Sequence, residues 1–104
     1  MKLSSMLESS VERELRLRVE ALGGLCIKVT AIGRRGFFDR VVVLPGGKVW
    51  FVELKRPKGG RLSPHQRWHL DEFSARGAMV ALVRSSDDID RLLNTFNIDR
   101  LLDT

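Results

Sequence analysis

The chain is short of cysteine and of long hydrophobic runs, and each shortage excludes a class of protein. Its single cysteine, Cys26, forms no disulfide within the chain and builds no thiolate zinc site alone, so we expect a reducing, intracellular location. No apolar run approaches the roughly 18–20 residues that cross a bilayer, so we expect no membrane segment. The N-terminal segment MKLSSMLESSVERELRLRVE carries charges where a secretion signal needs apolar residues.

Acidic residues are also scarce. Thirteen Asp and Glu residues stand against eighteen Lys and Arg residues, which gives a formal net charge of +5. Such an excess favours polyanionic partners, although a protein can be basic without binding nucleic acid. Between residues 34 and 67, nine basic residues accompany only two acids, Asp39 and Glu53. Two carboxylates kept inside a basic stretch suggest a metal ion held beside phosphate.

The 104 residues fit one domain, residues 1–104, with the composition of an ordinary globular protein. Apolar periodicity and turn residues predict seven elements in the order α-β-β-β-α-β-α. The predicted elements are a helix from about Ser5 to Leu22, strands at Leu25–Ala31, Phe38–Leu44 and Val49–Lys55, a helix from Ser63 to about Arg76, a strand at Ala78–Val83, and a helix from Ser86 through Leu93. The tail, residues 96–104, is apolar enough to pack, but the sequence names no partner for it.

The third predicted strand should lie at the centre of the sheet, because it is apolar on both faces. The first three strands can form an antiparallel meander, and the fourth can join through the preceding helix. The fold class is therefore α/β, with a central mixed sheet flanked by helices.

Two charged residues end this central strand. Glu53 and Lys55 are two apart, so their side chains share one face. One interpretation is a solvated ion pair at an exposed strand end. The other includes Asp39, which a hairpin would bring beside the same strand end. Two neighbouring carboxylates repel each other, and a hard cation such as Mg²⁺ or Mn²⁺ relieves that repulsion.

The register of this hairpin decides whether the two acids can share a metal ion. With a four-residue loop from Pro45 to Lys48, Asp39 would face Leu54 and lie on the opposite face from Glu53. A shared site therefore requires a loop of odd length or a β-bulge, and Gly46-Gly47 permits either.

Taken together, these residues resemble the VRR-NUC (virus-type replication-repair nuclease) domain of the PD-(D/E)XK nuclease superfamily. The matching stretches are Val11-Glu12, Leu22-Gly23-Gly24 with Lys28, Gly33 to Arg40, Leu44 to Lys48, Phe51 to Lys55, and Ser63 to Gln66. They cover most of the chain in order. One departure is Phe38, which stands where the family usually has proline before the aspartate.

The resemblance implies a restriction-endonuclease-like fold and a set of site residues. Asp39 and Glu53 would bind Mg²⁺ or Mn²⁺ with the backbone carbonyl of Leu54, and Lys55 would be the catalytic lysine. Glu12 would act on the metal directly or through water, unless it is an ordinary surface glutamate. Gln66 would lie near the active site, although a helix capping box with Ser63 also explains it.

Four basic loop residues are candidates for DNA binding, with a solvated loop as the alternative: Arg34, Arg35, Lys58 and Arg61. Trp50 and Trp68 can stack on bases, but core or dimer contacts are the better interpretation in a domain this small. Cys26 is expected to be a buried structural thiol.

The resemblance implies a metal-dependent endodeoxyribonuclease that cuts structured DNA, such as Holliday junctions, as a cytoplasmic homodimer of a phage or bacterium. Two alternatives stay open. One is a flap or single-strand nuclease within a replication or restriction system. The other is a non-catalytic DNA-binding module of the same fold.

Overall fold

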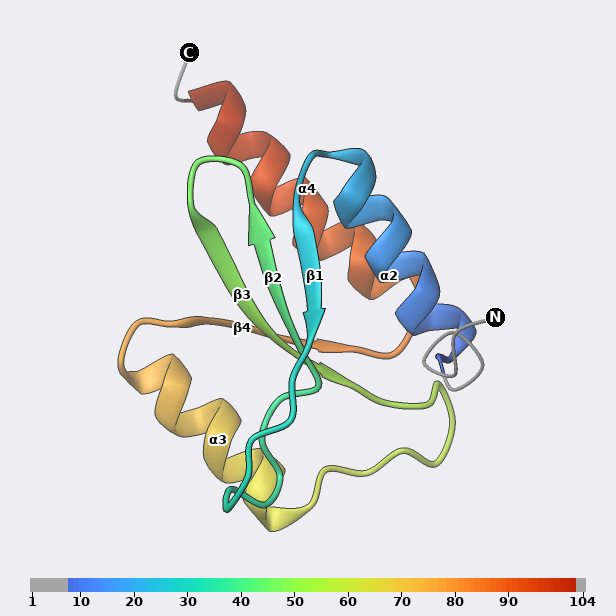
Figure 1. The fold of residues 1–104 in the computed structure, drawn as a ribbon, viewed down its shortest axis with the longest axis vertical. Coiled ribbons are helices and arrows are strands. Elements are labelled where there is room, and N and C mark those ends of the chain that lie inside the picture. Colours follow the sequence, from blue (N-terminus) through green and yellow to red (C-terminus); the bar gives the residue numbers. More distant parts are fainter. Residues whose placement is uncertain (1–7, 103–104) are drawn as a thin grey trace.

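Four strands form one mixed sheet in the order β1-β2-β3-β4, and helices lie on both of its faces (Figure 1). The computed structural model describes residues 8–102. The elements are α2 (Ser10–Ala21), β1 (Leu25–Lys28), β2 (Arg40–Leu44), β3 (Lys48–Leu54), α3 (Pro64–Ala75), β4 (Met79–Val83) and α4 (Ser86–Leu102). The first two pairings are antiparallel and the third is parallel. The predicted meander and the central place of the third strand are confirmed.

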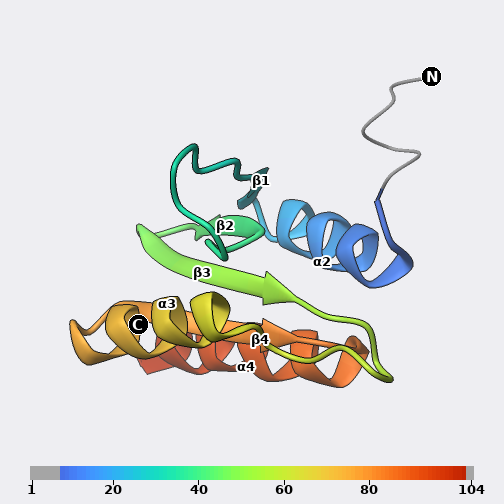
Figure 2. The ribbon, with the colours of Figure 1, turned by 90° about the horizontal axis from the view of Figure 1, so that it is seen from below.

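The main core lies between the sheet and the helix pair α2 and α4. It buries apolar side chains from both helices and from all four strands: Leu15, Val19, Cys26, Val42, Leu44, Val52, Val83, Ile89, Leu92, Leu93 and Phe96. Seen from below, the sheet is strongly twisted, and β4 lies beside α3 and α4 (Figure 2). The predicted buried thiol at Cys26 is confirmed.

An aromatic cluster fills the space between α3 and the other face of the sheet. Phe38 and Phe51 each approach Phe73 of α3 with ring centroids 5.0 Å apart, and Phe37 lies 5.3 Å from Phe38. Phe38 is almost fully buried. The residue that replaces the family's proline therefore has a packing role, because it anchors α3 beside Asp39.

Three predicted boundaries differ most from the structure, and the second strand also begins two residues later than predicted, at Arg40. The first helix begins at Ser10, because Ser9 caps it by accepting the Glu12 N–H at 3.1 Å; residues 5–7 of the prediction lie outside the described range. The first strand ends at Lys28, after which the chain turns. The last helix continues through the predicted tail to Leu102, since the tail residue Phe96 belongs to the main core.

Candidate active site

The hairpin between β2 and β3 has the register that a shared site requires. Leu44 pairs with Lys48, which leaves the odd-length loop of residues 45–47, and the ladder continues to Arg40 opposite Val52. One step further the regular ladder stops: the Asp39 N–H donates at 3.0 Å to the carbonyl of Val52, the residue that already pairs with Arg40, so Asp39 and Arg40 oppose one residue as in a β-bulge. A bulge re-aims the side chain that it carries, and the Asp39 carboxyl group hydrogen-bonds that of Glu53. The two acids therefore meet where β2 begins and β3 ends.

The carboxylate of Asp39 is fixed by the backbone of the central strand. Its Oδ2 accepts the Leu54 N–H at 2.7 Å. The next N–H, that of Lys55, donates to Val83 in β4 on the other side. In a strand, the N–H and C=O of one residue point to the same neighbour. The Leu54 carbonyl therefore lies on the Asp39 side, as a ligand at this site would have to.

Glu53 is a buried carboxyl group, with 2% of its surface exposed. Burial, the charge of Asp39 and a hydrogen bond with Asp39 raise the pKa of Glu53 to about 8, and Lys55 only partly opposes this. Gln66 donates from Nε2 to Glu53 Oε1 at 2.7 Å. Gln66 also closes a capping box with Ser63, so both of its expected roles occur together.

Glu12 reaches the site region but is held by another residue. Its carboxylate accepts from Nε of the buried Arg40 at 2.8 Å, and the same guanidinium donates to Glu8 at 3.1 Å and to the Cys26 carbonyl at 3.4 Å. Glu12 therefore lies at the edge of the candidate site as the partner of an arginine. Sequence reasoning missed Arg40, although it lies on the same strand face as the buried Val42 and Leu44.

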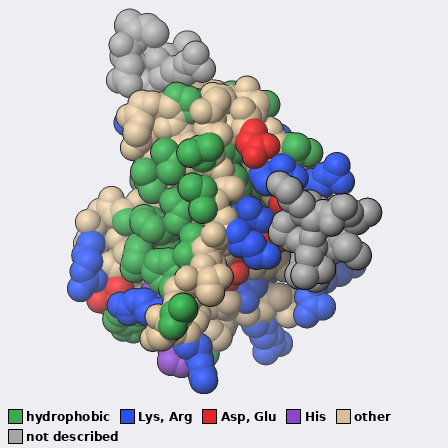
Figure 3. Space-filling view, in the orientation of Figure 1, with side chains coloured by type: hydrophobic (Ala, Val, Ile, Leu, Met, Phe, Trp, Pro, Cys, Tyr) green, Lys and Arg blue, Asp and Glu red, His purple; other side chains and the backbone are tan. Residues whose placement is uncertain are grey.

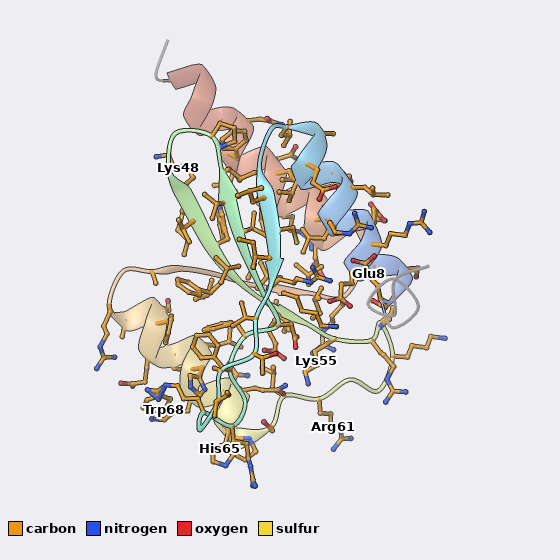
Figure 4. The ribbon with its side chains drawn as sticks, in the orientation of Figure 1. Glu8, Lys48, Lys55, Arg61, His65 and Trp68 are labelled. Carbon is orange, nitrogen blue, oxygen red and sulfur yellow. The ribbon has the colours of Figure 1, made fainter. Side chains whose placement is uncertain are left out.

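A cavity of about 490 Å³ opens between the start of α2 and the ends of β1 and β3. Its lining includes Glu12, Lys28, Asp39, Leu54, Lys55 and Arg56. Figure 4 shows Lys55 near the middle of the molecule, at the end of β3 that is far from Lys48. Lys28 and Arg56 were not among the predicted site residues. With Lys55 they give the cavity three cations that suit a phosphodiester.

The four predicted DNA-binding residues are all exposed, on two loops: Arg34 and Arg35 before β2, and Lys58 and Arg61 after β3. In Figure 3, Lys and Arg side chains surround an apolar area. Arg84, at the end of β4, donates to the Arg56 and Gly60 carbonyls and ties the second loop to the sheet. Trp68 is half exposed, so it does not belong to the core, and its alternative role in a dimer contact stays a prediction, whereas Trp50 packs against the main core.

The donor set fits a hard cation. Within residues 8–98, no three side chains of His, Cys, Asp or Glu converge as a ready-made metal cage. Mg²⁺ does not need such a cage, because it is usually held by one or two carboxylates and keeps several waters. The buried carboxyl group of Glu53, the partly buried one of Asp39 that repels it, and the nearby Leu54 carbonyl meet that requirement.

Comparison with known proteins supplies two relatives. The chain is 39% identical over 90 residues to a protein named "Putative nuclease p44" from Acyrthosiphon pisum secondary endosymbiont phage 1, covering 86% of this chain and 95% of that protein. It is 40% identical to a solved VRR_NUC domain, with a TM-score of 0.75 over 81% of this chain and 90% of that one. No family model matches the chain. Among the described helices, none has the length and apolarity to span a membrane.

Proposed function

Since the chain belongs to the VRR-NUC family of nucleases, we propose that it is a metal-dependent endodeoxyribonuclease that hydrolyses phosphodiester bonds. The observation that carries the proposal is the contact between the carboxyl groups of Asp39 and Glu53, where β2 begins and β3 ends, beside a cavity that Asp39 and Lys55 line. A solvated ion pair at a strand end does not account for a glutamate as buried as Glu53.

The residues divide into metal ligands and phosphate ligands. Mg²⁺ or Mn²⁺ would be held by Asp39, Glu53 and the Leu54 carbonyl, with Glu12 reaching it only through water while Arg40 holds its carboxylate. Such an ion, when bound, polarises a phosphodiester and lowers the pKa of a bound water.

Around the metal ligands, the cations and one amide act on the substrate and on Glu53. Lys55 neutralises charge that develops on the phosphoryl oxygens, and Lys28 and Arg56 bind the same backbone in the cavity. Gln66 orients the Glu53 carboxyl group through its 2.7 Å hydrogen bond.

The proposed substrate is branched or junction DNA, cut by a homodimer. The substrate class follows from the family resemblance. An apolar area on the edge of the sheet supports the dimer: Leu25 and Ile27 of the edge strand β1 are 58% and 49% exposed. Two copies related by a twofold axis would present two sites for paired cuts.

Cleavage of labelled DNAs tests the proposal. The panel contains a duplex, a flap and a four-way junction, each with Mg²⁺, Mn²⁺ or EDTA. We expect metal-dependent junction cutting that Asp39→Ala and Lys55→Ala abolish. Lys48→Ala is the matched control, because it removes a lysine from the far end of the same strand (Figure 4).

Other outcomes separate the alternatives. Binding without metal-dependent cutting of any DNA would mean a non-catalytic module, and flap cutting without paired junction incision would mean a flap nuclease. Sedimentation of the wild type and of Ile27→Glu tests the dimer, which we expect the new charge to dissociate; a wild type that sediments as a monomer contradicts it.

A further inference from the structure

The loop between β1 and β2 places an arginine over an exposed tryptophan of α3. The Arg34 guanidinium carbon lies 5.6 Å from the centre of the Trp68 ring. A tight turn positions it: the Arg34 N–H donates to the Ala31 carbonyl at 3.2 Å, and Gly33 supplies the positive φ of +79°. This pair is called the Trp–Arg platform below.

The loop is held against α3 just after this turn. Gly36 has a φ of +76°, and a Cβ there would lie 2.5 Å from the Cβ of His65 and 2.8 Å from the Gln66 nitrogen. Only glycine lets the backbone approach so closely. The Trp–Arg platform is therefore built on a fixed contact with the helical turn whose Gln66 hydrogen-bonds Glu53.

Both members of the platform remain accessible to a ligand. Trp68 is 50% exposed, and Arg34 is exposed and forms no ion pair with the acids in residues 8–98. Exposed bases stack on aromatic rings and on guanidinium planes, and a neighbouring cation binds the phosphate that accompanies them. Further positive charge lies beside the platform on Arg35 and Arg67.

We propose that the Trp–Arg platform binds an unpaired nucleobase of the DNA substrate by stacking. The inference rests on the proposed function, because it takes DNA as the substrate, and it adds a structural requirement for that DNA. Bases inside a duplex present only their edges, so a stacking platform selects DNA in which a strand has left the helix. Branched or frayed ends satisfy this requirement and a continuous duplex does not.

The position of the platform sets where the unpaired base lies. Gln66 and Trp68 are two residues apart in α3, which places them roughly 200° apart around the helix. Trp68 is therefore about one helix diameter, roughly 10–12 Å, from the side that contacts Glu53. A base stacked on Trp68 therefore lies beside the site of cleavage and not in it.

Fluorescence in EDTA tests the platform without cleavage. The chain has two tryptophans, so a Trp50→Phe background leaves Trp68 as the reporter. Two probes of equal length are compared: a blunt duplex and a forked duplex with unpaired strands at one end. We expect the fork to quench Trp68 and to bind more tightly than the blunt duplex. In the native chain, Trp68→Ala should weaken fork binding roughly 5- to 100-fold and leave blunt-duplex binding unchanged.

Two further variants control for charge and for ring loss. Arg67→Ala removes the adjacent exposed cation, whose ion-pair partner Asp71 is 3.9 Å away, and should weaken both probes equally. Trp68→Phe should retain most of the preference for the fork. Equal weakening of both probes by Trp68→Ala, or an unquenched Trp68 with the fork, overturns the platform.

The same proteins assayed with Mg²⁺ separate this inference from the proposed function. Fork-selective quenching in a protein that cuts no DNA would sustain the platform and remove the nuclease assignment. Metal-dependent cutting of DNA without any preference for the fork would sustain the nuclease assignment and remove the platform.

Discussion

Replacing Arg40 with methionine tests whether the buried arginine holds α2 to the sheet. Arg40 is 6% exposed and donates to Glu12, to Glu8 and to the Cys26 carbonyl. Methionine fills a similar volume but donates no hydrogen bond. The change therefore leaves carboxylates beside the sheet without their cation.

The two glutamates are not affected equally. Glu8 keeps a second partner, because Arg16 donates to it at 2.9 and 3.1 Å. Glu12 has no other cation within the described residues and is 12% exposed. Removing one partner of a buried pair costs about 3–5 kcal/mol. Because only the Glu12 carboxylate loses its cation, we expect the free energy of unfolding to fall by about 3 kcal/mol.

Urea unfolding followed by tryptophan fluorescence at neutral pH, in EDTA, measures this loss. Adding Glu12→Gln to Arg40→Met should recover part of it, with a coupling energy of about 1–3 kcal/mol between the two positions. Arg91→Met, which removes an exposed ion pair with Asp88, should cost under about 1 kcal/mol. A loss for Arg40→Met no larger than that of Arg91→Met, or additive changes at positions 12 and 40, would refute the reasoning.

Three further predictions concern buried groups. Because the pKa of Glu53 is raised from 4.5 to about 8, its contribution to stability in EDTA should be complete below pH 4.5 and lost as pH rises through 8. The urea midpoint of Glu53→Gln should not show this loss, and midpoints of the wild type and the variant that change in parallel with pH would contradict the prediction. Burial raises the pKa of the Cys26 thiol to about 11, so iodoacetamide at pH 8 should alkylate the thiol in urea but not in the folded protein. Mass spectrometry measures the alkylation, and equal rates in the folded and the urea-unfolded protein would contradict the prediction. Phe38→Ala should lower the free energy of unfolding by about 3–5 kcal/mol in thermal melts, and a loss below about 1 kcal/mol would show that the aromatic cluster does not depend on it.

The sequence predicts element order well because apolar pattern and turn residues agree along the chain. The second helix illustrates this: Ser63, Pro64 and Gln66 predict its start, and the capping box forms as expected. The last helix shows the limit. Ile89, Leu92, Leu93 and Phe96 continue a helical spacing, but the polar residues between them obscure it, and only packing in the main core shows that the helix continues.

The candidate site was less predictable than the fold. The residue types indicate that Asp39 and Glu53 belong together, but Gly46 and Gly47 allow loops of either parity, so only the folded hairpin shows that the two carboxyl groups meet. The partner of Glu12 was not predictable from the spacing within α2. Arg40 lies 28 residues later in the chain, and the two meet only when α2 packs on the sheet.

The three-residue turn at Pro45, Gly46 and Gly47 has a consequence for how such a chain can change length. It lies five strand residues from Asp39, roughly 17 Å at about 3.3 Å per residue, and contributes no atom to the cavity. A residue inserted there can be taken up by the loop while Leu44 stays paired with Lys48, and Asp39 and Glu53 then keep their places. Only a shift of the strand pairing by one residue would turn Asp39 away from Glu53. Descendants of this sequence can therefore vary the length of the turn without losing the site, provided that the Leu44–Lys48 pair is kept.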